Sequence, residues 1–345
     1  MKVIVDGFGG DNAPAEVLKG CALAVKEYGV SLIITGDVQK LQAAARENGV
    51  SLENIEFENA TQVITMEDEP TDVVKAKGDC SMAVGLKLLK EGRGDAFVSA
   101  GNTGALVVGS STLVGRIKGI KRAALAPMLP TTKGMYMLMD SGANLECRPE
   151  MLVQFGIMGS VYMSKIAGIQ NPRVGIVNVG TEATKGTELE LAANDLFKLA
   201  PVNCIGNVEA RELPLGGCEV AVTDGFTGNV ILKLTEGLAK GFSSNIKKML
   251  FKNTATKLAA LMLKSGLNDF KKSMDYTEYG GAPLMGIAKP VIKAHGSSDA
   301  NAFKNAIRQA KAFSEQNVIG EIEAGLKRLS SNLAEREGVQ SGAKA

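Results

Sequence analysis

Short apolar runs alternate along the chain with longer stretches in which apolar residues recur at three- and four-residue spacing. The short runs predict strands at 2–6, 32–36, 95–100, 135–140, 173–180 and 219–225. Helical spacing fills most of the gaps, for example 13–29 and 81–92. Because alternating strands and helices build parallel sheets covered on both faces, the pattern predicts a three-layer α/β/α fold with a mostly parallel sheet.

The predicted strands end in similar residues. Gly, Asn, Thr and Asp fill the segments 6–14, 99–105, 140–144, 178–186 and 223–229. Ligands of open α/β sheets bind at the carboxyl ends of strands, and such loops offer close backbone approach and exposed N–H groups. We therefore expect a cradle for a small oxyanion, although ordinary turn chemistry would explain any single loop. The candidate substrate-binding residues are Gly9, Gly10, Asn12, Gly101, Asn102, Thr103, Gly104, Asn144, Gly180, Thr181, Gly186, Thr227 and Gly228.

Standard nucleotide and metal motifs are absent from the sequence. Asn12 occupies the place of the third glycine in GxGxxG, and no GxxxxGK[ST], HExxH or GxSxG pattern occurs. The single histidine, His295, argues against chemistry that needs several imidazoles. We therefore favour phosphate or a phosphate ester over NAD or ATP, and we predict no cofactor and no metal.

Composition places the chain among large globular proteins. With 345 residues and 45% hydrophobic content, the chain can bury a large core in one large domain or in two lobes, and we expect a single large α/β domain over 1–345. A net charge of +2 is too balanced for a general nucleic-acid footprint. We expect a cytoplasmic location, because no secretory signal or membrane-spanning run is evident and the five cysteines lack CxxC spacing.

Several ordered motifs resemble those of the bacterial phosphate acyltransferase family. They are "GGDNAP", "SAGNTGA", "GRIKGI", "LVQFGIMGSVY", "GTEATKG", "TDGFTGNV", "YGGAPLMGI" and "IKAHGSS" with "KNAIRQA", and they run from about residue 3 to 310. Some positions depart from the family pattern: "DGFGGD" replaces "DAMGGD", "DSGAN" replaces "DVGAN", and Cys80 stands where a Ser is usual.

The resemblance implies a fold similar to isocitrate and isopropylmalate dehydrogenases and to phosphotransacetylase, assembled as a homodimer. It implies that a long-chain fatty acyl group attached to acyl carrier protein (acyl-ACP) reacts with inorganic phosphate. The products are acyl phosphate and free ACP, and acyl-CoA is a poorer donor. The product would pass to a membrane glycerol-3-phosphate acyltransferase. It also implies peripheral membrane association.

This reaction needs an anion cradle and donors for a tetrahedral oxyanion, without a covalent enzyme nucleophile. We expect Lys185 to meet phosphate or the oxyanion; alternatively it is a solvated lysine paired with Glu182 or Glu188.

We expect Asn229 to orient the carbonyl or phosphate, although Asn is also a common helix cap. Asp11 and Asp224 would repel phosphate, so we assign them to loop bracing.

His295 is expected to stabilise charge or to protonate the leaving thiolate, although a lone histidine is more often structural. The residues that follow it could open a helix and present N–H groups to the anion, and they are Gly296, Ser297 and Ser298. Acylation of Cys80, Cys204 or Cys218 is a weaker alternative, because no nearby base is evident.

Two basic segments suggest surfaces for partners. A cluster at 115–122 is our candidate for docking the acidic ACP, with a solvated turn as the alternative; it consists of Arg116, Lys118, Lys121 and Arg122. Residues 242–274 form an inserted basic amphipathic segment, with seven lysines and Asp269 as the one acidic residue. We expect it to lie on an anionic bilayer through Leu258, Leu261 and Met262, and a dimer-interface or core-covering helix is the alternative.

Three other functions would be compatible with similar loops. A phosphotransacetylase-like enzyme would use short acyl-CoA, and a dehydrogenase would need NAD and a metal. A membrane-bound scaffold would have no chemistry of its own.

Overall fold

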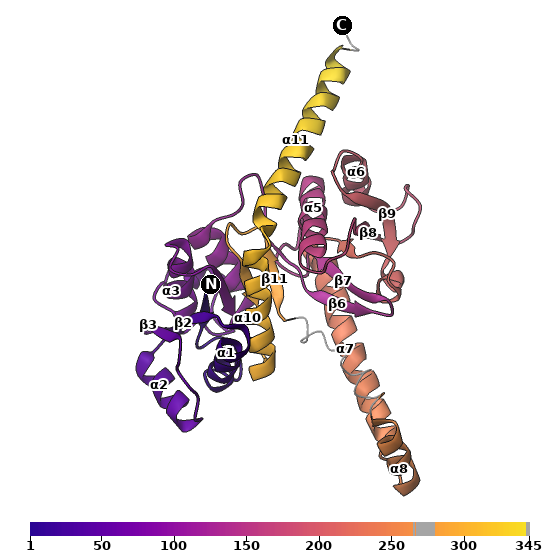
Figure 1. Cartoon of the computed structure of the whole chain (residues 1–345). Coiled ribbons are helices and arrows are strands. Elements are labelled where there is room, and N and C mark those ends of the chain that lie inside the picture. The colour runs from indigo at the N-terminus through magenta and orange to yellow at the C-terminus, as the bar shows by residue number, and fades with distance from the viewer. Residues whose placement is uncertain (265, 267–279, 343–345) are drawn as a thin grey trace.

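The computed structural model describes residues 1–264, 266 and 280–342. The first sheet has the order β3-β2-β1-β4-β12-β11-β5 (Figure 1). Its strands are β1 (Lys2–Asp6), β2 (Ser31–Gly36), β3 (Ile55–Asn59), β4 (Ala96–Ser99), β5 (Ala124–Leu125), β11 (Ala282–Met285) and β12 (Val291–Lys293). Strands β3, β2, β1, β4 and β12 run parallel, whereas β11 is antiparallel to both of its neighbours.

A second sheet has the order β6-β7-β10-β8-β9. It contains β6 (Met128–Thr131), β7 (Gly134–Met139), β8 (Arg173–Asn178), β9 (Asn203–Glu209) and β10 (Val220–Val222), and only β6 pairs antiparallel. The α/β class and the mostly parallel pairing are confirmed. The strands nevertheless divide between two sheets, because a strand's partner is chosen by tertiary packing and not by the alternation along the chain.

Helices cover these sheets and connect their strands. The packed helices are α1 (Ala15–Tyr28), α2 (Val38–Glu47), α3 (Ser81–Lys90), α4 (Thr103–Gly109), α5 (Pro149–Lys165), α6 (Glu188–Phe197) and α10 (Ala300–Glu315). Short 3-10 helices lie at Pro70–Val73 and Ala210–Leu215, and a π-helical turn follows α4 at Ser110–Val114. Helices α1 and α10 approach so closely that a Cβ on Gly20 would lie 2.5 Å from the Cβ of Phe303.

The core is continuous across the two sheets. One apolar cluster contains Val3 and Val98 of the first sheet together with Met137 and Val174 of the second. Ile4 points to the opposite face of β1 and belongs to a separate cluster under α3. Both faces of the first sheet are therefore buried, as a three-layer arrangement requires.

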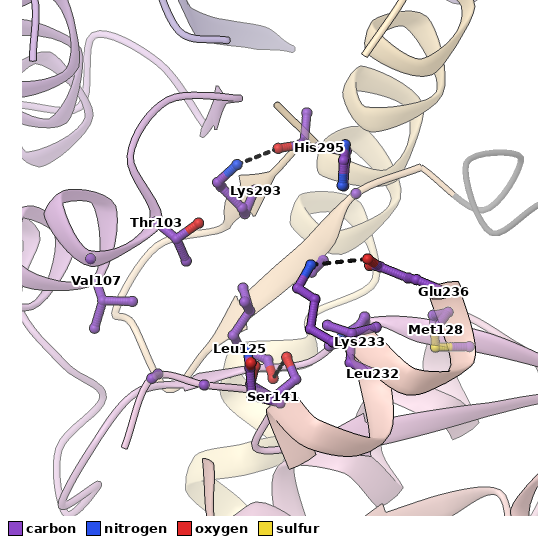
Figure 2. A pocket seen from close by; sticks show the side chains of 18 of the residues that line it. Thr103, Val107, Leu125, Met128, Ser141, Leu232, Lys233, Glu236, Lys293 and His295 are labelled. Atoms are coloured by element: carbon purple, nitrogen blue, oxygen red, sulfur yellow. Dashed lines mark hydrogen bonds and ion pairs between the residues drawn. The ribbon is translucent and has the colours of Figure 1, made fainter. Parts of the chain in front are cut away.

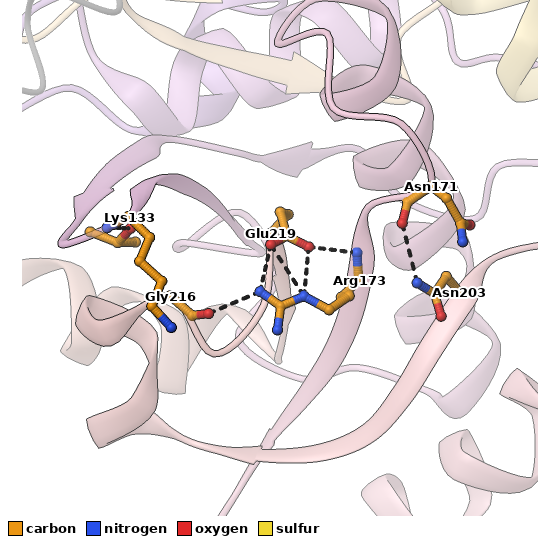
Figure 3. Close-up of polar contacts among 7 residues, drawn as sticks. Lys133, Asn171, Arg173, Asn203, Gly216 and Glu219 are labelled. Carbon is orange, nitrogen blue, oxygen red and sulfur yellow. Dashed lines mark hydrogen bonds and ion pairs between the residues drawn. The ribbon is translucent and has the colours of Figure 1, made fainter.

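A partly exposed ion pair aligns strands of the second sheet (Figure 3). The Arg173 guanidinium donates to the Glu219 carboxylate, with Nη2 2.6 Å from Oε1, and also to the carbonyl of Gly216. Nearby, the Asn203 amide donates to the carbonyl of Asn171 at 3.2 Å. These contacts hold β8, β10 and β9 at their amino ends, so the loops at the carboxyl ends start from fixed strands.

Three helices extend beyond this body: α7 (Gly225–Leu250), α8 (Thr254–Met262) and α11 (Val318–Gly342). Helix α7 runs away from the sheets and leads to α8, while α11 points in another direction (Figure 1). The segment 242–274 is helical as predicted over most of its described part, but its first helix starts at Gly225; residues 265 and 267–274 lie outside the described residues. Within the described ranges, no helix combines the length and hydropathy needed to cross a bilayer.

Candidate active site

Three loops of the first sheet meet because β1, β4 and β12 are close neighbours in it. The Asp11 N–H donates to the carbonyl of Gly296 at 2.8 Å. The Asn12 side chain donates to the carbonyls of Ser297 and Ser298, both at 3.3 Å. The structure thus brings the predicted loops 6–14 and 292–298 together, with Asp11 and Asn12 bracing them from the β1 side.

A buried carboxylate fixes the loops after β1 and β4. Asp6 accepts hydrogen bonds from Ser99 Oγ at 2.7 Å and from the Phe8 N–H at 3.3 Å. Burial raises the pKa of Asp6. A Cβ on Gly9 would lie 2.7 Å from Asp6 Oδ2 and 2.8 Å from Gly101 N, so this contact requires glycine. Asp6 and these glycines therefore position the loops by close packing.

A second buried carboxylate does the same in the other sheet. Asp140, which follows β7, accepts from the N–H groups of Leu125 and Asn144 at 2.9 and 2.7 Å. The Asn144 side-chain amide donates to Asp140 and to the carbonyl of Ala123. A Cβ on Gly228 would lie 1.8 Å from the Asp140 carbonyl oxygen. Asn144 and Gly228 thus hold β5, β7 and α7 together, and their contact with substrate stays a prediction.

The start of α7 shows how Asn229 is presented. Asp224 is the N-cap and accepts from the N–H and the hydroxyl of Thr227, at 2.9 and 2.8 Å. The expectation that Asp224 braces its loop is confirmed, and the alternative that Asn229 caps the helix is wrong. Asn229 lies farther along α7 and donates its side-chain amide to the carbonyl of Ser141 at 3.1 Å.

A cavity of about 460 Å³ is lined by elements of both sheets (Figure 2). This volume is within the usual range for small-molecule sites. The first sheet and its helices contribute Thr103, Gly104, Val107, Val108, Lys293 and His295, and the second contributes Ser141, Gly142, Asn229, Leu232, Lys233 and Glu236. Four of the predicted site residues therefore meet here: Thr103, Gly104, Asn229 and His295.

Lys293 provides a buried ammonium group at the cavity. Only 8% of the residue is exposed, and its Nζ donates to the carbonyls of Ala294 and Ala100 at 2.6 and 3.2 Å. Burial lowers the pKa of Lys293 to about 8, against the opposing influence of Asp6 and Asp11. A desolvated cation of this kind interacts more strongly with an anion than a cation in water does.

His295 lies beside Lys293 at the same edge (Figure 2). Its Nδ1 accepts from the Ser297 N–H at 3.2 Å and lies 2.9 Å from Ser297 Oγ. Burial is the main reason that the pKa of His295 is lowered, so the neutral imidazole predominates at pH 7. We assign the ring proton to Nε2 from this hydrogen bonding.

Sequence reasoning missed Lys293, Lys233 and Glu236. Lys293 ends β12, so the rule that located the other loops would have found it if 291–293 had been interpreted as a strand. Lys233 and Glu236 follow Asn229 at helical spacing and form an ion pair of 3.0 Å at the cavity. Helical periodicity carried forward from Asn229 would have identified both.

The loop that carries Lys185 follows β8 and lies outside this cavity. Its backbone is ordered by Lys185 N–H donation to Glu182 and by Asn178 donation to the Lys185 carbonyl, both at 3.0 Å. The Lys185 side chain is exposed, and within the described ranges no ion pair joins it to Glu182 or Glu188. The roles predicted for Lys185, Gly180, Thr181 and Gly186 stay predictions.

The three cysteines considered as acyl carriers do not line the cavity. Burial raises the pKa of Cys80 and Cys204, and it raises that of Cys218 to about 12. Cys80 caps α3 through Sγ, which accepts from the Ala83 N–H. Because a thiolate is the nucleophilic form, these surroundings disfavour a covalent cysteine intermediate.

The fold is that of an α/β protein similar to solved phosphotransacetylases. A phosphotransacetylase from Streptococcus pyogenes superimposes with a TM-score of 0.61 at 18% identity, covering 91% of this chain and 94% of that one. For the Staphylococcus aureus enzyme the TM-score is 0.59 at 18% identity, with coverage of 90% and 94%. A 4-hydroxythreonine-4-phosphate dehydrogenase from Klebsiella pneumoniae gives 0.50 at 14% identity, with coverage of 91% and 99%.

Sequence comparisons are more specific. The model of the family described as fatty acid synthesis protein matches residues 1–321. The phosphate acyltransferase of Alkaliphilus oremlandii is 51% identical over 329 residues, which cover 95% of this chain and 98% of the relative. The phosphate acyltransferase of Clostridium botulinum (strain ATCC 19397 / Type A) is 47% identical over 333 residues, which cover 96% of this chain and 99% of the relative. The chain belongs to the phosphate acyltransferase family, as the motifs predicted, and is a phosphate acyltransferase of fatty acid and phospholipid synthesis.

Proposed function

We propose that the intersheet cavity transfers a long-chain fatty acyl group from acyl-ACP to inorganic phosphate, giving acyl phosphate and free ACP. The observation that carries this proposal is the mixed lining of the cavity, which combines polar groups with apolar side chains. The polar groups include Lys293, His295 and Asn229, together with the ion pair of Lys233 and Glu236. The apolar side chains are Val107, Val108, Leu125, Pro127, Met128 and Leu232. An anion and a hydrocarbon chain would be accommodated side by side.

In the proposed step, a phosphate oxygen attacks the thioester carbonyl directly. The O–C bond forms, the C–S bond breaks, and the thiolate leaves with the electron pair. Lys293 would attract and hold phosphate, while the second N–H of the Asn229 amide would stabilise the oxyanion. His295 would protonate the thiolate from Nε2, although a thiol pKa of about 8.5 makes that help modest.

We propose Lys185 as a second lysine for phosphate. Its loop follows β8, and β8 pairs with β10, whose carboxyl end leads into α7 and Asn229. Lys185 thus belongs to the same edge of the second sheet as the start of α7 with Asn229, and its exposed side chain is suited to meeting phosphate as it enters. The neighbouring Gly186, with φ of 104°, lets the loop pack closely against the side chain of Asn178, since a Cβ there would lie 2.7 Å from Asn178 Nδ2.

The basic turn 115–122 is our proposed docking surface for ACP. Its four basic residues are exposed, while Ile117 and Ile120 are buried beneath them. Gln154 supports the turn by accepting from the Lys121 N–H and donating to the Gly119 carbonyl, both at 2.9 Å. Leu125 of the cavity follows Arg122 by three residues, at most about 11 Å of chain. An acidic carrier docked here would be beside the cavity.

We propose that the enzyme works as a homodimer at the membrane surface. Helix α8 has no buried residue, and Leu258, Leu261 and Met262 are 61, 67 and 88% exposed. Its surroundings are basic, with Lys252, Lys257 and Lys264 among the described residues. Release of the amphiphilic acyl phosphate at an anionic bilayer would bring it to a membrane glycerol-3-phosphate acyltransferase.

The proposed reaction is tested with radiolabelled palmitoyl-ACP and phosphate, without ATP or added metal. We expect phosphate-dependent accumulation of labelled acyl phosphate and free ACP. Turnover of acetyl-CoA but not palmitoyl-CoA or palmitoyl-ACP would instead support a short-chain phosphotransacetylase. Failure to consume any thioester, together with retained liposome binding, would support the scaffold alternative.

A further inference from the structure

A second cavity of about 250 Å³ shares a lining residue with the first. It is formed by the hairpin β6–β7, the segment at the carboxyl end of α5 and the outer part of α10. Its lining is mostly apolar, with Met128, Met135, Tyr162, Ile166, Ala167 and Ala312, and it also includes the polar residues Arg308 and Gln309. The volume is below the usual range for an independent ligand site, so the cavity is better suited to extend another one.

The two cavities adjoin at two points. Met128 lines both of them. Gln309 of the second cavity accepts from the N–H of Gly281, a lining residue of the first, at 2.8 Å. At these two points the cavities are therefore divided only by a partition that consists of Met128 and the hydrogen bond between Gln309 and Gly281.

The chemistry of the partition restricts what can pass it. Gln309 Nε2 donates to the Tyr162 hydroxyl at 2.8 Å within the core, so both ends of the Gln309 amide have protein partners. Methionine is unbranched and flexible, and its side chain can change rotamer at little cost. A thin apolar chain could displace Met128, whereas a headgroup or a hydrated ion would lose its hydrogen bonds there.

We propose that the methyl end of a long acyl chain passes Met128 and occupies the second cavity, so that Met128 and this cavity determine the longest acyl group the enzyme uses. This inference rests on the proposed acyl transfer. The first cavity must hold phosphate and the thioester as well as the chain. The additional methylene groups of a longer chain would therefore need the second cavity, where each methylene group is removed from contact with water.

The decisive variant is Ala312→Phe, because it fills the second cavity from α10 and leaves the first unchanged. Acyl-CoA donors from C8 to C18 are compared by phosphate-dependent release of CoA. Each methylene kept in water should lower kcat/KM about fourfold. We expect the C16 to C8 ratio of kcat/KM to fall at least tenfold. Gln316→Phe, which adds the same ring at an exposed position just beyond α10, should keep the wild-type ratio.

Met128→Ala should act in the opposite direction and raise the C18 to C12 ratio, because the partition becomes smaller. Equal chain-length profiles for wild type, Ala312→Phe and Met128→Ala would overturn the inference while leaving the acyl transfer established. Absence of turnover with every donor in wild type would instead overturn the proposed function. Thermal unfolding of each variant checks that the fold is kept.

A second measurement does not depend on turnover. Palmitoyl-CoA carrying a diazirine at its methyl end is irradiated with the full-length protein, and labelled peptides are located by mass spectrometry. We expect attachment to the carboxyl end of α5 around Ala167 or to α10 around Ala312. Attachment confined to α4 or α7 at the first cavity would show that the chain does not enter the second.

Discussion

Lys293 and Lys185 present the same ammonium group in opposite environments. Lys293 is buried and held by two backbone carbonyls, so its direction is fixed before phosphate arrives. Lys185 is exposed, on a loop whose backbone is held by hydrogen bonds such as that from Asn178 to the Lys185 carbonyl. A fixed, desolvated charge contributes more to a transition state than a mobile, solvated one, because less reorganisation accompanies the reaction.

Replacing Lys293 by Met should lower kcat/KM for phosphate by about 100-fold or more, since Met keeps the length and removes the charge. Lys185→Ala should produce a loss of similar order if Lys185 also meets phosphate during turnover. Both are measured with palmitoyl-ACP at varied phosphate, with Lys198→Ala on the exposed end of α6 as a control. A change within a few-fold for either variant would remove that lysine from the mechanism.

Catalysis should depend on pH through Lys293. The pKa of this ammonium is lowered from 10.5 to about 8, so the free enzyme carries the charge below pH 8 and loses it above. We therefore expect kcat/KM for phosphate to fall as pH rises through about 8. In Lys293→Arg the charge persists, so the residual activity should lack this decline. If kcat/KM for phosphate falls in the same way at alkaline pH in both proteins, the group that titrates is not Lys293.

The site could be predicted from sequence only in part, for identifiable reasons. Strand-end glycines, asparagines and threonines pointed to loops beside the candidate cavity, which Asn229 and His295 line. Asn144 and Gly228, chosen by the same rule, brace the structure internally, and their contact with substrate stays a prediction. Residue type alone does not distinguish a hydrogen bond to ligand from one to a neighbouring loop.

Helix α7 joins the candidate site to a projecting tip, which is formed by helix α8. Its first turns contribute Asn229, Lys233 and Glu236 to the cavity, and its far end leads to α8. A contact at the tip is therefore connected to the site by one continuous helix. This arrangement is compatible with synthesis of an amphiphile beside the surface that receives it.

The double variant Leu258→Glu/Leu261→Glu should abolish binding to anionic liposomes while keeping turnover in solution, because it places charge on the apolar part of α8. Sedimentation with phosphatidylserine-containing and neutral vesicles measures this. Ala255→Glu/Ala259→Glu adds the same charge to other exposed positions of α8 and controls for repulsion. Equal loss in both double variants would mean that net charge, and not the apolar surface, controls binding.

Charge reversal in the basic turn 115–122 tests whether this turn is the docking surface for ACP. Arg116→Glu with Lys118→Glu should raise KM for palmitoyl-ACP at least tenfold and leave KM for palmitoyl-CoA nearly unchanged, because only the protein donor covers this surface. The effect should weaken as salt is added. Parallel increases for both donors would exclude the turn as an ACP docking surface.

At the scale of the whole molecule, all six predicted strands occur, and α1 and α3 occupy the predicted helical stretches. The pattern did not identify β3, β9 or the short strands β5, β6, β11 and β12. Strands β5, β11 and β12 have two to four residues, too few for a periodicity to develop. The division into two sheets depends on contacts between segments far apart in sequence, such as β4 with β12, so no local pattern could predict it.

We propose that the two copies of the proposed homodimer associate through the exposed surface of α7. Apolar residues recur every fourth position along it, namely Phe226, Val230, Leu234, Leu238 and Phe242, with 64, 51, 60, 51 and 64% exposure. Such a row winds along one side of a helix, and a second copy of α7 would cover it by ridge-and-groove packing. The dimer would then fix the helix that carries Asn229.

If the proposed homodimer forms through α7, Leu234→Lys with Leu238→Lys should convert it to a monomer, because each protomer would bury two lysines in the interface. Sedimentation velocity at several concentrations measures the change. Leu258→Glu/Leu261→Glu is the matched control and should stay dimeric, since the tip and the α7 row are separate apolar surfaces. Because α7 carries Asn229, the monomer should also lose turnover, and the dimer control should keep it. A dimeric Leu234→Lys/Leu238→Lys protein would place the interface on another element.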